Sequence, residues 1–200
     1  MAIGLAFDTE TTGVLEFRMP RNSPTQPDLV QLGCILFDDE TGREYAVVDV
    51  TVKPSLPVEE KAMSIHGKTP EILDLVGIPR RSAVSIFHGL LTKADFILAH
   101  NLNFDIGILH VAYLRENVSP DLLLSKRQEC TMLKTTDMMK LPNVKRPGTY
   151  KWPSLDEAYR KYVDPTGFEN AHDAMADIRA CKAVYMAVKD LGPDGKPKEL

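Results

Sequence analysis

Three short apolar segments follow one another early in the chain, at residues 2–7, 29–37 and 44–53. Each has the length of one strand and is shorter than an ordinary helix, which is typical of strands buried in a core. Turn-forming residues at 38–42 separate the second segment from the third and predict a hairpin. Residues 18–28 contain three prolines and few apolar side chains, which predicts a loop before the hairpin. The remainder of the chain must fit around a sheet built from these strands.

Helical signals dominate the later part of the chain. They predict helices at residues 70–76, 82–93, 104–116, 154–162 and 173–189. Ser82 and Ser154 are the expected N-cap residues of two of these helices, and Ser154 begins a capping-box sequence. A fourth buried strand is expected at 96–99, and a surface loop at 140–152. Strands followed by alternating helices and strands predict an α/β fold, with a partly antiparallel sheet covered by helices.

The composition fits one folded unit. Of the 200 residues, 44% are apolar and 26% are charged, so we expect a single domain over residues 1–200, with a frayed tail from about residue 192. The formal net charge of −4 gives no overall attraction for nucleic acid, so such a partner would be recognised at a local site. Three scattered cysteines fit neither a zinc site nor a disulfide framework. The apolar N-terminal run is too short for a signal peptide or membrane span, which predicts a cytoplasmic protein without a membrane partner.

Two carboxylates, Asp8 and Glu10, directly follow the first apolar segment. Alternate residues of a strand face the same side, so these like charges would lie close together and repel one another. A divalent cation such as Mg²⁺ or Mn²⁺, which prefers hard oxygen ligands, would remove that repulsion. The alternative is a charged strand end facing solvent, the common explanation of an isolated Asp-x-Glu sequence.

Two further segments carry carboxylates where helices begin. Asp105 comes where the strand at 96–99 gives way to a helix, a frequent location of sites in α/β sheets; alternatively, it complements the helix dipole. Asp177 lies among alanines, whose small side chains would let its helix approach the sheet closely. Asp173 is the expected N-cap or a first-turn residue of that helix, and His172 precedes it on a loop. Taken alone, His172 fits an exposed loop histidine.

Together the three segments resemble the DEDDh exonuclease family, also described as DnaQ-like. Residues 8–13 (Asp-Thr-Glu-Thr-Thr-Gly) match its first motif, residues 100–105 match its second, and His172 with Asp177 matches its third. The resemblance extends over about residues 2–188. A tyrosine in place of His172 would have marked the sister DEDDy group. The resemblance implies a ribonuclease-H-like fold, in which a five-stranded mixed sheet is flanked by helices.

The resemblance also implies a two-metal mechanism for 3′→5′ hydrolysis of phosphodiester bonds, with release of nucleoside 5′-monophosphates. Asp8, Glu10, Asp105 and Asp177 would hold two divalent cations, Mg²⁺ or Mn²⁺. One cation would lower the pKa of the attacking water, and the other would stabilise the leaving 3′-oxygen. His172 would accept the proton of that water as general base, since an imidazole pKa lies near neutrality.

Five residues would contact the terminal nucleotide according to the same resemblance, namely Thr12, Gly13, His66, Asn101 and Phe104. Gly13 would permit a close approach of the substrate to the backbone. For His66 the alternative is a surface position at the edge of a helix. For Phe104 the alternative is packing inside the protein.

Two features depart from the resemblance or fall outside it. Many relatives have an Asp-Thr pair where this chain has Cys130 and Thr131, which blurs the subfamily without touching a catalytic position. The loop around Lys145, with Tyr150 and Trp152 nearby, is the best candidate for contacting a nucleic-acid strand beyond the site, because aromatic side chains can stack on bases.

Three functions stay open on the sequence alone. The first is a free-standing exonuclease that needs a free 3′ end and acts mainly on single-stranded DNA or frayed ends. The second is an RNA exonuclease resembling oligoribonuclease or ribonuclease T, since sugar discrimination depends on contacts at the 2′-position. The third is a proofreading subunit that mainly docks on a polymerase or repair partner. All five catalytic positions are filled, which disfavours a module without activity, and the oligomeric state stays open.

Overall fold

The computed structural model describes residues 1–169 and 173–197. Its strands are β1 (Ile3–Thr11), β2 (Leu29–Asp38), β3 (Glu44–Lys53), β4 (Ile78–Pro79), β5 (Phe96–Ala99) and β6 (Arg127–Cys130). Its helices are α1 (Glu60–His66), α2 (Pro70–Val76), α3 (Arg80–Leu91), α4 (Leu102–Arg115), α5 (Asp121–Ser125), α6 (Thr131–Met139), α7 (Leu155–Tyr162) and α8 (Ala174–Val188). Within these residues the strands form one sheet in the order β4-β3-β2-β1-β5-β6.

β1 lies in the middle of the sheet and joins its antiparallel and parallel parts. It pairs antiparallel with β2 and parallel with β5, and β5 pairs parallel with β6. β2 and β3 form the expected hairpin. The α/β class with a mixed sheet is thus confirmed. The described sheet has six strands where five were expected, because β4 adds two residues in parallel beside Val52 and Lys53. A strand that short leaves no periodic pattern in a sequence.

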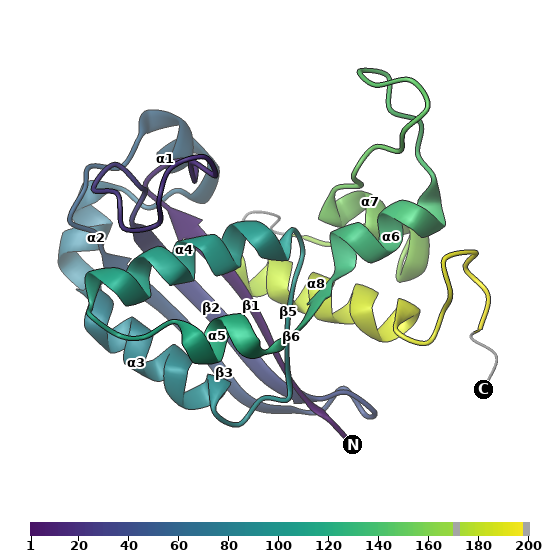
Figure 1. Cartoon of the computed structure of the whole chain (residues 1–200), viewed down its shortest axis with the longest axis horizontal. Helices are drawn as coiled ribbons and strands as arrows, with labels where there is room; N and C mark the ends of the chain where they lie inside the picture. The colour runs from purple at the N-terminus through teal and green to yellow at the C-terminus, as the bar shows by residue number, and fades with distance from the viewer. Residues whose placement is uncertain (170–172, 198–200) are drawn as a thin grey trace.

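Helices cover both faces of this sheet (Figure 1). Because side chains alternate along β1, Leu5 and Phe7 face a core shared with α3 and α4, whereas Ala6 faces a second core shared with α8. Phe87 of α3 meets the Phe7 ring edge-on, with 5.1 Å between the ring centroids. The carboxyl end of β1 therefore lies between α4 on one face and α8 on the other.

Most expected elements occur, with boundaries shifted by a few residues. α7 begins with the predicted capping box, in which Ser154 and Glu157 each accept the other's backbone N–H. The prediction of Ser82 as an N-cap is wrong: α3 begins at Arg80, directly after Pro79, because β4 leads straight into it. The elements α1, α5, α6 and β6 were not predicted, since each has at most nine residues and shows little periodicity.

Two smaller expectations concern the end of the chain and the membrane. Near the end of the described chain, Leu191 forms a bridge with Pro197, and the Gly192 N–H donates to the Lys196 carbonyl (2.8 Å). Gly195 adopts a positive φ of 75° at this turn, a conformation that glycine takes without strain. Fraying of the tail from about residue 192 stays a prediction. Over the described ranges, no helix combines the length and apolarity needed to cross a membrane.

Candidate active site

Three segments bring carboxylates to the carboxyl end of β1. Asp8 and Glu10 lie on β1 itself, Asp105 lies in the first turn of α4, and Asp177 lies in the first turn of α8. α4 follows β5, which runs parallel beside β1, so α4 begins near the end of β1. α8 packs on the opposite face of the same strand. The structure thus brings together the four acids that the sequence singled out.

Asp105 is held against β1 by two hydrogen bonds. Its Oδ1 accepts from the Thr9 backbone N–H at 3.1 Å and from the Thr9 hydroxyl at 2.7 Å. The residue is 3% exposed, so a turn toward solvent would leave two buried donors unsatisfied. The position of this carboxylate relative to Asp8 and Glu10 is therefore fixed by the strand that carries them.

Small residues let α8 lie directly on the sheet. Gly33 of β2 lies under Ala174 and Ile178, and a methyl group on Gly33 would collide with the Ile178 Cδ1 atom. At the start of the helix, the Asp173 carboxylate accepts from two backbone N–H groups of the first turn, as expected for an N-cap. This close packing places Asp177 beside the end of β1.

The clustered carboxylates raise one another's pKa values. Burial, followed by repulsion from Asp105, Glu10 and Asp177, raises the pKa of Asp8 well above its ordinary value. Burial and the charge of Asp177 raise the pKa of Glu10 to about 7. Burial likewise raises the pKa of Asp105 to about 7, although hydrogen bonds lower it. Perturbed pKa values of this kind gather where like charges are held together, as at functional sites.

The donor set suits hard divalent cations. All four acids offer oxygen ligands, and a cation would cancel the repulsion that helps to raise the pKa values of Asp8, Glu10 and Asp105. In the part of the chain that the structure describes, no group of three or more histidine, cysteine or carboxylate side chains is closed around a point that could hold a metal ion. Mutual repulsion opposes such closure. The chemistry of the ligands therefore fits a metal centre.

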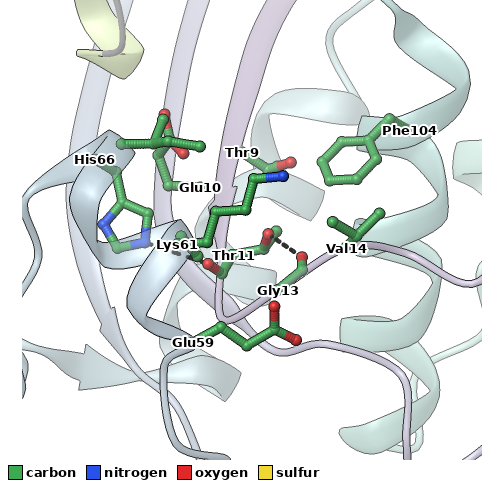
Figure 2. A pocket seen from close by; sticks show the side chains of 11 residues that line it. Thr9, Glu10, Thr11, Gly13, Val14, Glu59, Lys61, His66 and Phe104 are labelled. Atoms are coloured by element: carbon green, nitrogen blue, oxygen red, sulfur yellow. Dashed lines mark hydrogen bonds between the residues drawn. The ribbon is translucent and has the colours of Figure 1, made fainter.

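A pocket of about 180 Å³ opens beside the carboxylates, between the end of β1, α1 and α4 (Figure 2). Glu10 belongs both to its wall and to the carboxylate cluster. Three of the residues expected at the terminal nucleotide, Gly13, His66 and Phe104, line it. The pocket is thus placed to hold a group that reaches the carboxylates from one side.

His66 is buried rather than exposed, so the expected alternative of a surface histidine is wrong. Its Nδ1 accepts from the Lys68 backbone N–H (3.0 Å), and its Nε2 lies 3.3 Å from the Thr11 carbonyl. Since a carbonyl only accepts, the proton lies on Nε2. Burial lowers the pKa of this imidazole, which favours the neutral ring. His66 therefore joins α1 to β1 while one edge of its ring faces the pocket.

Three other sequence-predicted residues lie elsewhere. Thr12 is buried outside the pocket lining, and its backbone N–H and hydroxyl are bonded to the backbone of Asp28. Asn101 is exposed with φ 66°, and it lines a separate hollow with Trp152. His172 lies outside the described residues. Substrate contact by Thr12 and Asn101, and catalysis by His172, stay predictions.

The sequence missed two charged residues of the pocket, Glu59 and Lys61. The Glu59 carboxylate lies against Gly13, where a methyl group on Gly13 would collide with it. Figure 2 shows the Lys61 side chain crossing the front of the pocket. Both residues belong to the start of α1, a seven-residue helix too short to be recognised by periodicity. Their only signal was a polar run shortly before His66.

His100 of the second motif has a structural role. Its Nε2 donates to the Pro153 carbonyl (3.1 Å), so its unprotonated Nδ1 accepts from the Thr131 hydroxyl (2.9 Å). Burial lowers the pKa of this imidazole, in keeping with a neutral ring. The side chain therefore fastens the end of β5 to α6 and to the segment that precedes α7.

Asp28 anchors the loop that follows the first motif. This residue is 1% exposed and forms ion pairs with Arg80 (2.6 Å) and with Arg115. The same carboxylate accepts from the Ser55 backbone N–H at 2.6 Å. One buried charge thus connects the loop before β2, the end of β3, the start of α3 and the end of α4.

Comparison with known proteins adds a family and two relatives. Residues 5–185 match the model of a family described as RNase_T, exonuclease. The chain is 26% identical over 193 residues to DNA polymerase III subunit epsilon of Pasteurella multocida (strain Pm70), covering 92% of this chain and 67% of the relative. It is 27% identical over 188 residues to the uncharacterized exonuclease CP81 of Escherichia phage 186, covering 90% of this chain and 85% of the relative.

Solved structures share the fold. E. coli exonuclease I in complex with a dT13 oligonucleotide superimposes with a TM-score of 0.74 at 22% identity, over 94% of this chain. A zinc-bound form of an E. coli exonuclease I complex with single-stranded DNA gives 0.73 at 23% identity. This chain spans 41% of the length of each of those chains. At these identities the likeness establishes the architecture of the chain.

Proposed function

Because the chain belongs to the RNase_T exonuclease family, we propose that it hydrolyses nucleic acids stepwise from the 3′ end and releases nucleoside 5′-monophosphates. The observation that carries this proposal is the convergence of Asp8, Glu10, Asp105 and Asp177 beside a small pocket. Oxygen ligands suit the cations of phosphodiester hydrolysis, and the pocket offers a place for a terminal nucleotide beside them.

The four carboxylates would hold two divalent cations, Mg²⁺ or Mn²⁺. Such ions lower the pKa of a bound water and neutralise charge on a phosphate. Thr9 would keep the Asp105 carboxylate in place while these ions bind, through the two hydrogen bonds described above. His172, two residues before the first turn of α8, would accept the proton of the attacking water.

The pocket would take the terminal nucleotide. Phe104 and Val14 offer apolar surface for a base or sugar, and the Glu59 carboxylate fills the space that Gly13 leaves at the backbone. His66, on the opposite wall, would present the edge of a neutral ring. Thr12 would act indirectly, because its hydrogen bonds to the Asp28 backbone hold the adjacent Gly13 in position. Asn101 would contact the strand beyond the pocket, from the start of α4.

We favour single-stranded DNA, or a frayed 3′ end, as the substrate. A pocket of about 180 Å³ suits one unpaired nucleotide rather than a base pair. E. coli exonuclease I, which shares the fold, was crystallised with a dT13 oligonucleotide. RNA is the alternative substrate, since the 2′-position decides between the sugars.

A proofreading role beside a polymerase is the second candidate. It is favoured by the similarity to DNA polymerase III subunit epsilon, which extends over 92% of this chain. In that case the chain should bind a replicative polymerase and remove a mismatched 3′ nucleotide from duplex DNA faster than a matched one.

The test of the proposed function is digestion of 5′-labelled oligonucleotides in Mg²⁺ or Mn²⁺. Attack at the 3′ end should give a ladder of shortening products, whereas attack at the 5′ end would release the label at once. Linear single-stranded DNA should be degraded under conditions in which a circular form survives. Cutting of the circle at the same rate would show an endonuclease and refute the proposal. Parallel reactions with RNA and with mismatched duplex DNA decide between the alternatives.

A further inference from the structure

The chain between α6 and α7 projects from the body of the molecule as a long loop (Figure 1). We call residues 140–153 the arm. Pro142 and Tyr150 form a bridge across it, and the Lys151 N–H donates to the Leu141 carbonyl at 2.8 Å. The two sides of the arm are therefore joined near its base, which gives it a defined shape for a protruding segment.

The arm reverses the charge of the chain locally. No acidic residue occurs between Asp137 and Asp156, whereas the whole chain has a net charge of −4. The same stretch holds four positive side chains, those of Lys140, Lys145, Arg146 and Lys151. Lys151 is paired with Glu157 at 2.6 Å. Across the described part of the chain, no ion pair joins Lys145 or Arg146 to a carboxylate, so both cations can meet a ligand.

Two aromatic rings accompany these charges. Tyr150 is 47% exposed and Trp152 is 63% exposed. Both rings line one hollow of about 660 Å³ together with Lys145 and Arg146. Flat rings and cations around one hollow match the alternation of bases and phosphates along an unpaired strand. An acidic protein segment would satisfy the charges but would leave the two rings without flat partners.

The arm is continuous with the proposed active site. Trp152 also lines a second hollow, of about 450 Å³, together with Asn101 at the start of α4. Asp105 lies in the first turn of that helix. The hydrogen bond from His100 to the Pro153 carbonyl fastens the base of the arm to the end of β5. A strand whose end reaches the carboxylates can thus pass the start of α4 and continue along the arm.

We propose that the arm binds the single-stranded stretch of nucleic acid that leads into the active site, on the 5′ side of the bond being cut. Bases stack on Tyr150 and Trp152, and phosphates pair with Lys145 and Arg146. This inference rests on the proposed function, because it leaves the terminal nucleotide to the pocket beside Gly13. It adds that a strand several nucleotides long is held along the arm as well as in the pocket, whereas a dinucleotide occupies only the pocket.

Trp152 provides a direct readout because it is the only tryptophan in the chain. Metal-free protein in EDTA, which removes the cations needed for turnover, is titrated with a thymidine oligonucleotide of about fifteen nucleotides. Tryptophan fluorescence should be quenched to saturation, and added salt should weaken the binding. A polyglutamate of equal charge should quench much less. Absence of quenching by DNA, or equal quenching by both polymers, overturns the proposal.

Two double variants distinguish binding by the arm from a general effect of positive charge on DNA binding. Lys145→Ala with Arg146→Ala should weaken oligonucleotide binding and reduce the slope of log K against log salt by about 0.7 for each lost phosphate contact. Arg81→Ala with Lys93→Ala removes two exposed charges elsewhere and should change neither quantity. Tyr150→Ala should weaken binding by about 5- to 150-fold, the worth of one stacked base. Equal effects of the two double variants would contradict a strand-binding role for the arm.

Hydrolysis assays keep this proposal distinguishable from the proposed function. The arm variants should raise KM for the long oligonucleotide while leaving hydrolysis of a thymidine dinucleotide unchanged, since a dinucleotide does not reach the arm. If the wild type hydrolyses no substrate but its fluorescence is still quenched, the exonuclease function is refuted, whereas strand binding by the arm is supported. If the wild type hydrolyses both substrates and the arm variants affect both equally, the exonuclease function is supported, whereas strand binding by the arm is refuted.

Discussion

At the scale of single residues, the notable feature is that four carboxylates gather at the carboxyl end of β1 although their negative charges repel one another. Burial and mutual repulsion raise the pKa values of Glu10 and Asp105 to about 7. A protein whose only requirement was stability would gain by replacing them with neutral side chains. Their presence is explained by a ligand of opposite charge, which is the physical basis of the proposed metal centre.

Loss of any one of these carboxylates should abolish most activity without unfolding the protein. Asp8→Asn, Glu10→Gln, Asp105→Asn and Asp177→Asn keep the shape of the side chain and remove the charge that a cation needs. Asp137→Asn, at an exposed position on α6, serves as the control and should keep full activity. Single-turnover cleavage and thermal melts measure the two effects. Unfolding of all four variants, with no effect of metal on the wild-type melt, would make these acids structural.

The metal-free protein should lose stability as the pH rises toward 8. Because the folded pKa of Asp105 is raised to about 7, the native state binds more protons than the unfolded state between the ordinary carboxyl pKa and about 7. The free energy of unfolding therefore falls through that window, by about 1–4 kcal/mol for such a carboxylate. Asp105→Asn should remove this part of the slope. Urea denaturation in EDTA at about pH 5 and about pH 8 measures it, and an equal slope in both proteins argues against the raised pKa.

The role of His172 decides whether the proposed metal centre also has a general base. If it accepts the proton of the attacking water, His172→Ala should bind metal and oligonucleotide normally but cleave about 10²–10⁴-fold more slowly. Wild-type cleavage should rise with pH as the imidazole loses its proton, and the variant should lack that rise. Single-turnover rates against pH, with binding measured in Ca²⁺, provide the comparison. A variant with the wild-type rate and profile would show that His172 is not the general base.

At the scale of secondary structure, the contact between α8 and β2 decides where Asp177 lies. Gly33→Ala would drive a methyl group into the Cδ1 atom of Ile178, so we expect the buried Ile178 side chain to be displaced and α8 to move away from the sheet. Overpacking of this kind costs about 1–3 kcal/mol, and a displaced carboxylate should lower the cleavage rate by up to about 10²-fold. Adding Ile178→Val removes the colliding atom and should restore both quantities in part.

A second glycine provides the control for this substitution. Gly89 lies within α3, and nothing lies within 4 Å of the place where its methyl group would go. Gly89→Ala should therefore stabilise the protein by about 0.5–1 kcal/mol and leave activity unchanged. Denaturation and cleavage assays on the three proteins test the idea. If Gly33→Ala behaves like Gly89→Ala, the packing of α8 does not position the site.

The sequence predicted the elements that have strong local signals. The apolar run at 29–37, the turn at 38–42 and the capping box at Ser154 each depend on neighbouring residues, and the structure has all three. α1 and β4 depend on contacts with distant segments, such as the bond between His66 and the Thr11 carbonyl. Elements fixed by such long-range contacts leave no period in the sequence, so they were missed.

The candidate site likewise contains residues that the sequence predicted and residues that it missed. Asp8, Glu10, Asp105 and Asp177 could be chosen because repulsion between nearby acids needs an explanation, and family motifs gave their order. Lys61 and Glu59 reach the pocket only because α1 folds against β1, a tertiary contact that residue type does not reveal. The bonds between Thr12 and the Asp28 backbone are likewise a tertiary contact that the motif did not reveal, and substrate contact by Thr12 stays a prediction.

At the scale of the whole molecule, Asp28 holds four segments together through its two arginine partners. Asp28→Ala would leave Arg115 as a partly buried charge without its carboxylate partner, while Arg80 would keep only its ion pair with Glu116 (2.7 Å), at a cost of about 3–5 kcal/mol. Asp74→Ala breaks the exposed pair with Lys53, whose side chains are 57% and 68% exposed, and should cost less than about 1 kcal/mol. Urea denaturation of both variants tests the difference. Equal losses would mean that the Asp28 network contributes no more than a surface pair.

The carboxylates come from positions 8, 10, 105 and 177, so the site draws on nearly the full length of the polypeptide. During synthesis the first three emerge from the ribosome well before α8 can dock on the sheet. If the four acids hold the proposed cations, a nascent chain carries only three of these ligands until α8 is made, and it should not hydrolyse nucleic acid before then. On the same proposal, cleavage of the chain between α7 and α8 should give two inactive fragments, and activity should return only when the fragments associate.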